Sequence, residues 1–306
     1  MRFYFKGQLG RGAAWMTVVT VLLTGICGGA DETKPATEGD VVEPAGAVEK
    51  VSFIKDGRLD LAAAVKYFED LYRSRSSIAE MELTVTRPRR TRTLRMKAWS
   101  LGEEKALIVI ETPAREKGTA TLKVGDNLWN YLPKIRRTIR IPPSMMLAPW
   151  MGSDFTNDDL VHEASYSKDY EYGLVGPSEE PKGWLVRFKA KPKVVGLWKR
   201  FELVVSEEGT LPLKAIYYDR KDRASREITW DRVRIVDGKR IPTRLVLIPL
   251  DKVKGKGKGE EQEEKTGVSG EKNRENYKTE IIYHDIDFDV AVPESTFSLS
   301  RLEQKR

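Results

Sequence analysis

Residues 81–98, MELTVTRPRRTRTLRMKA, contain two runs in which apolar and polar residues alternate. The runs cover residues 81–86 and 93–98, and Pro88-Arg89 lies between them as a turn signal. A period of two places apolar side chains on one face of a strand and polar side chains on the other. The stretch therefore predicts an antiparallel β-hairpin with one dry face.

The charges on the polar face of this hairpin predict its register. A turn at Pro88-Arg89 sets Glu82 opposite Arg95 and Glu80 opposite Lys97. Exposed cross-strand pairs of opposite charge contribute only about 0.2–1 kcal/mol each. Both pairs nevertheless agree on one register, and a slip by one residue would turn the apolar side chains to the wrong face.

Similar runs continue almost to the end of the chain, and glycine or proline turn signals separate most of them. We expect strands at residues 106–111, 120–124, 128–132, 138–141, 166–174, 184–190, 199–205, 213–219, 226–236, 243–249 and 277–288.

One long helix is expected, at residues 60–72, where Leu61, Val65 and Phe68 recur at helical spacing. About a dozen strands beside one helix predict a mainly β (α+β) fold with a single antiparallel domain. The strands do not alternate with helices, which excludes a parallel nucleotide-binding sheet.

The N-terminus reads as a targeting segment. Arg2, Lys6 and Arg11 precede a run of apolar and small residues at 13–26, as in a signal peptide covering residues 1–30. The run is shorter than the roughly 20 apolar residues of a spanning helix. Cleavage before Asp31 would remove Cys27, whereas a lipoprotein would keep Cys27 as an acylated anchor. Both predictions place the protein in the periplasm.

Composition divides the rest of the chain. Residues 31–55 are poor in large apolar groups and are expected to form a flexible tether, and residues 252–275 are expected to form a charged, disordered insert within a domain at 56–304. The formal net charge is +7, with bases and acids interspersed. This pattern argues against a nucleic-acid partner, whose binding surface gathers cations.

Enzyme motifs are missing. The chain has only two histidines, His162 and His284, too far apart in sequence for a His-Glu-x-x-His zinc motif. It contains neither a Gly-x-Ser-x-Gly elbow nor a phosphate-binding glycine loop. Asp154, Asp158 and Asp159 are more simply explained by local capping than by catalysis. We therefore expect no enzyme, no catalytic residue, no metal and no cofactor.

Residues 128–160, LWNYLPKIRRTIRIPPSMMLAPWMGSDFTNDDL, combine large apolar groups with four prolines. Prolines deny this segment a long helix or a central strand, so the apolar groups must lie on irregular chain over something dry. Two interpretations remain open. The segment either seals the end of a core, or forms a lid over a groove in which methionine and aromatic side chains adapt to an acyl chain.

This stretch carries a resemblance to a known family. YLPKIRR at 131–137, PPSMM at 142–146 and WMGSDFTNDDL at 150–160 closely resemble the signature of the outer-membrane lipoprotein-sorting (LolA-like) proteins. The strand entry at 240–243 and the closing VPESTF at 292–297 follow in the order of that family. The resemblance covers about residues 61–302, and the charged insert departs from it.

The resemblance implies a single curved sheet forming an unclosed half-barrel, with an N-terminal helix and a lid loop over an apolar cavity. It implies a monomeric periplasmic carrier that binds acyl chains of lipoproteins or lipids for transfer toward the outer membrane. An inner-membrane transporter would be the donor, and an outer-membrane acceptor could receive the cargo. Two alternatives stay open: a periplasmic sensor or regulator of the same fold, and an accessory lipid-binding protein of an inner-membrane transporter.

Candidate ligand-binding residues come from the apolar faces of the predicted strands and from the lid segment. They are Met81, Leu83, Leu94, Met96, Ile108 and Ile110 on the strands, and Trp129, Tyr131, Met145, Met146, Trp150 and Phe155 in the lid segment.

Overall fold

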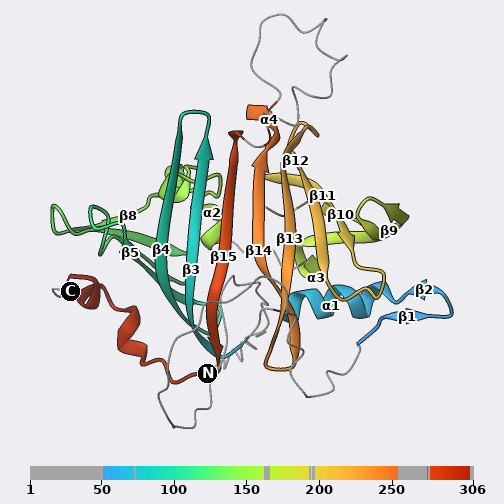
Figure 1. Cartoon of the computed structure of the whole chain (residues 1–306), viewed down its shortest axis with the longest axis horizontal. Helices are drawn as coiled ribbons and strands as arrows, with labels where there is room; N and C mark the ends of the chain where they lie inside the picture. The colour runs from blue at the N-terminus through green and yellow to red at the C-terminus, as the bar shows by residue number, and fades with distance from the viewer. Residues whose placement is uncertain are drawn as a thin grey trace, which may run out of the picture.

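The computed structural model describes residues 51–71, 74–161, 166–192, 194, 197–253, 274 and 276–303 (Figure 1). The predicted signal peptide, with Cys27, lies outside the described residues, as do His162 and most of the predicted tether and insert. Within the described ranges, no helix is both long and apolar enough to cross a membrane.

In this part of the chain, thirteen strands form one antiparallel sheet in the order β8-β7-β6-β5-β4-β3-β15-β14-β13-β12-β11-β10-β9. A separate short pair consists of β1 (Ile54–Lys55) and β2 (Arg58–Leu59). The strands of the large sheet are β3 Ser76–Arg87, β4 Arg90–Leu101, β5 Lys105–Thr112, β6 Ala120–Val124, β7 Asn127–Leu132, β8 Arg137–Arg140, β9 Tyr170–Glu179, β10 Lys182–Ala190, β11 Trp198–Val205, β12 Pro212–Asp219, β13 Ala224–Val236, β14 Lys239–Pro249 and β15 Lys278–Phe288.

The strand order consists of two meanders joined along β3 and β15. The first meander runs outward from β3 to β8, and the second returns from β9 to β15. The two edges of the sheet are therefore β8 and β9, which follow one another in the chain. The sheet curves without closing, which confirms the predicted half-barrel (Figure 1).

The predicted hairpin is confirmed in its register. Glu82 lies opposite Arg95 and Glu80 opposite Lys97 across β3 and β4. Both pairs form ion pairs, at 3.4 Å and 3.0 Å. The local alternation and the cross-strand charges were sufficient to predict the register, because a two-residue turn joins the two strands.

The predicted strand at 166–174 is wrong at its beginning. Tyr166–Asp169 forms a short helical turn, α3, and the strand β9 starts only at Tyr170. The backbone amide and hydroxyl of Ser167 both donate to the carboxylate of Glu69, at 2.7 Å and 2.9 Å. This contact from a distant helix holds the turn, and the local sequence gives no sign of it.

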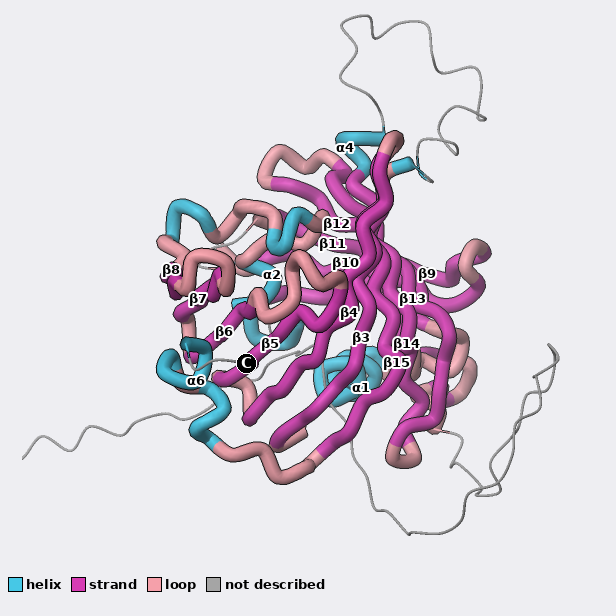
Figure 2. The backbone as a smooth tube through the Cα atoms, turned by 60° about the vertical axis from the view of Figure 1, so that its left-hand side comes forward, coloured by secondary structure: helices cyan, strands magenta, loops and turns pink. Residues whose placement is uncertain are grey.

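The predicted long helix is present as α1, Leu61–Leu71. Asp60 caps it by accepting a hydrogen bond from the backbone amide of Ala63 at 3.2 Å. The apolar side of α1 is buried against the sheet through Ala64, Val65 and Phe68. Figure 2 shows the sheet wrapped around this helix. We call the face of the sheet that α1 covers the inner face.

The opposite, outer face carries its own cover at one end. The short helices η3 (Glu294–Phe297) and α6 (Leu299–Glu303) pack there on β5 and β6. Phe297 and Leu302 are buried beside Leu107 and Leu122. In this meander both faces of the sheet are therefore partly dry, which explains why β5 has a nearly continuous apolar run at residues 106–110.

Candidate functional site

Two apolar rows cross the strands on the inner face. The first joins Leu94, Leu83, Ile281 and Leu245, each directly opposite the next. The second joins Ile110, Met96, Met81 and Tyr283 in the same way. All eight side chains are at most 9% exposed.

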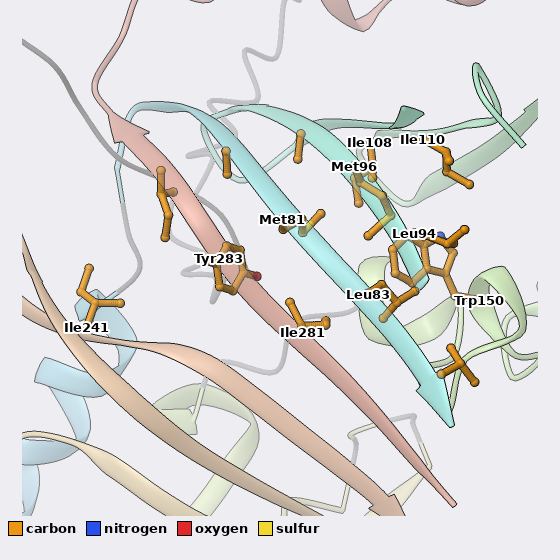
Figure 3. Packing of buried hydrophobic residues seen from close by; sticks show 14 of the residues in the cluster. Met81, Leu83, Leu94, Met96, Ile108, Ile110, Trp150, Ile241, Ile281 and Tyr283 are labelled. Carbon is orange, nitrogen blue, oxygen red and sulfur yellow. The ribbon is translucent and has the colours of Figure 1, made fainter. Parts of the chain in front are cut away.

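Figure 3 shows that side chains from β3, β4, β5 and β15 of this cluster lie on one side of the ribbon. The rows run perpendicular to the strands, because residues that lie directly opposite one another on neighbouring strands point to the same face of the sheet. The inner face is therefore apolar over several adjacent strands.

The connection between the two edge strands covers this face. Because β8 and β9 lie at opposite edges of the sheet, the chain between them must pass from one edge to the other. We call residues 142–160 the lid. It contains the 3₁₀ turns η1 (Pro143–Met145) and η2 (Trp150–Gly152) and leads into the short helix α2 (Asp158–Val161). The absence of a long helix here agrees with its prolines.

Trp150 is the lid residue most deeply inserted in the apolar cluster. Its side chain is 2% exposed and packs with the inner-face residues (Figure 3). Met151, Phe155 and Leu160 are partly buried and pack against the same cluster. The indole Nε1 donates to Thr121 Oγ1 at 3.1 Å. The backbone amide of Trp150 donates to the carbonyl of Phe155 at 2.7 Å, which closes the loop around the indole.

Arginines on β3 and β4 hold the middle of the lid. Arg87 forms a bidentate ion pair with Asp154 at 2.9 Å and 3.0 Å, and the Asp154 side chain is only 2% exposed. Thr279 Oγ1 of β15 donates to the same carboxylate at 2.7 Å. Arg92 donates to the carbonyl of Met151 at 2.5 Å and also pairs with Glu116. These contacts tie the lid to the central strands.

The far end of the lid is tied to the second meander. Arg226 of β13 forms a bidentate pair with Asp159, with both N–O distances 2.9 Å. Thr156 donates to Asp159 through its amide and hydroxyl at 2.8 Å and 2.9 Å. The guanidinium of Arg226 also lies over the rings of Trp198 and Tyr217 at 4.3 Å and 4.6 Å.

Burial alone would raise the pKa of Asp159, but the adjacent Arg226 and the Thr156 hydrogen bonds hold it below its ordinary value. The pair is therefore charged at neutral pH and has little contact with water. Its energy depends on both partners, because a single buried ion left without its counterion is costly.

The structure divides the twelve candidate ligand-binding residues into groups. Eight lie together, either on the inner face or in the lid against it: Met81, Leu83, Leu94, Met96, Ile108, Ile110, Trp150 and Phe155. Met146 packs beside them in a smaller cluster with Leu128 and Ile141. Met145 is 49% exposed and points away from the core.

Trp129 and Tyr131 lie elsewhere. Both belong to β7 and pack in the outer-face cluster with Phe297, and this placement corrects their assignment to the lid segment. In β7 the residue between them, Asn130, faces the other way and accepts a hydrogen bond from Thr121. Residues in one strand alternate between faces, and the sequence does not say which face is the inner one.

Several residues of the site were not predicted. Ile281 and Tyr283 follow the alternation in β15, so a register-based search along that strand would have found them. The pairs Arg87–Asp154 and Arg226–Asp159 each join residues 67 positions apart, and no local pattern indicates them. Among the described residues, no group of three or more His, Cys, Asp or Glu side chains is placed to hold a metal ion.

Solved structures with this architecture are known. A DUF1329 family protein from Desulfovibrio piger has a TM-score of 0.64 and 23% identity, covering 79% of this chain and 98% of its own. A domain from Vibrio parahaemolyticus named for outer membrane lipoprotein sorting has a TM-score of 0.62 and 21% identity, covering 80% and 98%. A LolA superfamily protein from Nitrosomonas europaea has a TM-score of 0.59 and 17% identity, covering 80% and 100%.

These likenesses establish the fold alone, because the sequence identities are low. None of the curated proteins compared with this chain matches it. Residues 102–304 match the model of a family described as uncharacterized proteins, and this range includes β5 to β15 and the whole lid. The chain therefore belongs to this DUF1329-like family of uncharacterized proteins, which has the fold of the outer membrane lipoprotein-sorting, LolA-like proteins.

Proposed function

We propose that this protein is a non-enzymatic periplasmic carrier that binds acyl chains of lipoproteins or lipids between the lid and the inner face of the sheet. The observation that carries the proposal is the pair of apolar rows on β3, β4, β5 and β15 beneath a lid that contributes Trp150 and Phe155. An inner-membrane transporter is the donor of the cargo, which the carrier passes toward the outer membrane.

The energetic requirement for such a carrier is specific. The transfer of a methylene group from an apolar environment into water costs about 0.8 kcal/mol. A chain of about sixteen carbons therefore needs an apolar site that offsets a transfer free energy on the order of 10 kcal/mol. The inner face supplies flexible Met81 and Met96 side chains opposite one another in the second row. Methionine adapts its shape to neighbouring hydrocarbon at low cost.

Release requires that binding be only moderately favourable. In the closed state Trp150 and its neighbours already shield the inner face. An acyl chain entering the site replaces these apolar contacts with similar ones. The net gain from binding is therefore much smaller than the full transfer energy, which leaves a favourable step to an acceptor.

The direct test uses the chain from Asp31 onward, which contains every described residue, titrated with a palmitoylated peptide and with the same peptide unacylated. The acylated peptide is expected to change tryptophan fluorescence with saturation. Trp150→Phe is expected to abolish most of the change, whereas the matched Trp129→Phe on the outer face keeps it. Equal responses in both variants, or no saturable response, would reject the proposed site.

Identification of the cargo needs material from the cell. Lipid extraction and mass spectrometry of protein isolated from the periplasm are expected to yield an acylated species in the wild type and less of it in Trp150→Ala. Intact-mass analysis of the same material distinguishes cleavage before Asp31 from acylation of Cys27.

A further inference from the structure

The edge of the first meander carries an unusual group of exposed cations. Lys134, Arg136, Arg137 and Arg140 lie in β8 and in the turn before it, and all four are exposed. Residues 127–153 contain no acidic residue. Arg140 donates to Asn127 Oδ1, and within the described structure none of the four forms an ion pair.

Exposed apolar side chains occur in the same segment. Ile135, Ile139, Met145 and Leu147 are 57%, 44%, 49% and 55% exposed. They are four of the ten large apolar side chains that are exposed among the described residues, and they fall within thirteen positions. We call these four residues and the four cations the β8 patch.

Protection of an edge strand does not explain the patch. Charged residues on an edge strand prevent pairing with another chain, which is a sufficient role for the arginines of β8. That role does not call for exposed isoleucine, methionine and leucine beside them, because apolar groups on an edge promote association. The combination has to be explained by something that binds both kinds of side chain.

The patch is continuous with the lid. β8 ends at Arg140, and the next residue, Ile141, is buried with Met146 of the lid. The backbone amide of Asp158 donates to the carbonyl of Met146 at 2.8 Å, which links this start of the lid to its end. A surface bound at the patch therefore lies beside the segment that covers the inner face (Figure 2).

We propose that the β8 patch docks the protein on the surface of an anionic phospholipid membrane. β8 meets the membrane along its free edge: Arg137 and Ile139 lie on one face of the strand and Arg140 on the other. The cations face lipid phosphates, and the exposed apolar side chains enter the boundary between headgroups and acyl chains. A lipid surface fits better than an acidic protein, because the apolar residues are spread over a turn, the strand β8 and the start of the lid, and a lipid surface needs no shape complementarity. The acidic residue Glu303 accepts a hydrogen bond from Thr138 of β8, and it belongs to α6, which lies on the outer face.

The inference goes beyond the carrier proposal, because docking needs no cargo. The test is flotation of the chain from Asp31 onward with vesicles of phosphatidylethanolamine and phosphatidylglycerol, and with vesicles of phosphatidylcholine alone. We expect binding to the anionic vesicles that weakens with salt, and little binding to phosphatidylcholine. Equal binding to both, or no binding to either at low salt, overturns the proposal and leaves the lipopeptide titration unaffected.

Variants separate the patch from general electrostatics. A basic residue at an anionic surface contributes about fivefold to partitioning, so Lys134→Glu with Arg137→Glu is expected to reduce binding more than tenfold. Ile135→Ser with Leu147→Ser is expected to reduce it severalfold at unchanged net charge. The matched control, Arg89→Glu with Arg90→Glu, makes the same charge change at the exposed tip of the β3–β4 hairpin and is expected to bind nearly as the wild type.

Two results contradict docking through the patch. One is an equal loss in the control and in the Lys134/Arg137 variant, which would mean that net charge alone decides binding. The other is full binding by the Ile135/Leu147 variant, which would leave the apolar residues without a role. All three variants change only exposed side chains, so their circular dichroism spectra are expected to match the wild type.

Discussion

Trp150 Nε1 donates a hydrogen bond to Thr121 Oγ1 over 3.1 Å, from the lid into β6. Both residues are almost fully buried, at 2% exposed each. Thr121 in turn donates to Asn130 of β7 at 2.8 Å. The most deeply buried apolar side chain of the lid is thus anchored to the sheet through a short chain of polar side chains inside an otherwise apolar region.

Trp150→Phe keeps an aromatic ring but leaves Thr121 without the indole donor, and the cost is expected to be about 1 kcal/mol. Trp150→Ala removes the ring and is expected to cost about 3 kcal/mol or more, unless the lid collapses into the space. Urea unfolding followed by circular dichroism measures both. A cost for the alanine variant no larger than for phenylalanine would show that the ring is not packed as described.

Asp159→Asn is expected to destabilise the fold by about 3–5 kcal/mol, because it leaves the Arg226 guanidinium buried without its counterion. Replacing both partners, as Asp159→Leu with Arg226→Met, is expected to recover most of the loss, since two apolar groups need no mutual compensation. A double-mutant cycle in urea measures the coupling. The exposed pair Lys182–Glu207 serves as the control, and Lys182→Met is expected to leave stability unchanged.

The same pair predicts an acid-sensitive lid. The pKa of Asp159 lies below its ordinary value in the folded protein. The stabilisation is therefore complete above the ordinary carboxyl pKa of about 4 and is lost as pH falls through the lower folded-state value. The urea concentration at the midpoint of unfolding is expected to decrease when the pH is lowered below about 4, and tryptophan emission is expected to shift with it. If the fall persisted unchanged in Asp159→Asn, another carboxyl group would be responsible.

Met81 and Met96 lie opposite one another in the second apolar row. Met81→Leu with Met96→Leu preserves volume approximately and is expected to change stability by less than about 1.5 kcal/mol. Leucine is less adaptable than methionine, so the variant is expected to bind a narrower range of acyl-chain lengths. Titration with peptides carrying chains of about 12 to 18 carbons tests this expectation, and an unchanged length profile would contradict it.

Much of the fold was predictable from residues close together in the sequence. The alternation in 81–98 determined the β3–β4 hairpin and its register, and helical spacing determined α1 within a residue or two of its ends. Most other strands were also found. Their patterns are local, because a strand with one buried face has apolar residues at every second position, whatever its place in the sheet.

The sequence by itself determined most of the strands, the hairpin register and the irregular, apolar character of the segment between β8 and β9. Only the tertiary structure decided which face is inner, so that Trp150 enters the apolar cluster while Trp129 packs under Phe297. It also decided that Asp154 and Asp159 hold the lid to Arg87 and Arg226. Asp159 also makes local hydrogen bonds with Thr156, in line with the capping expected from the sequence. The physical reason is that period-two alternation defines two faces without naming them, and a buried ion pair depends on spatial proximity that no local spacing encodes.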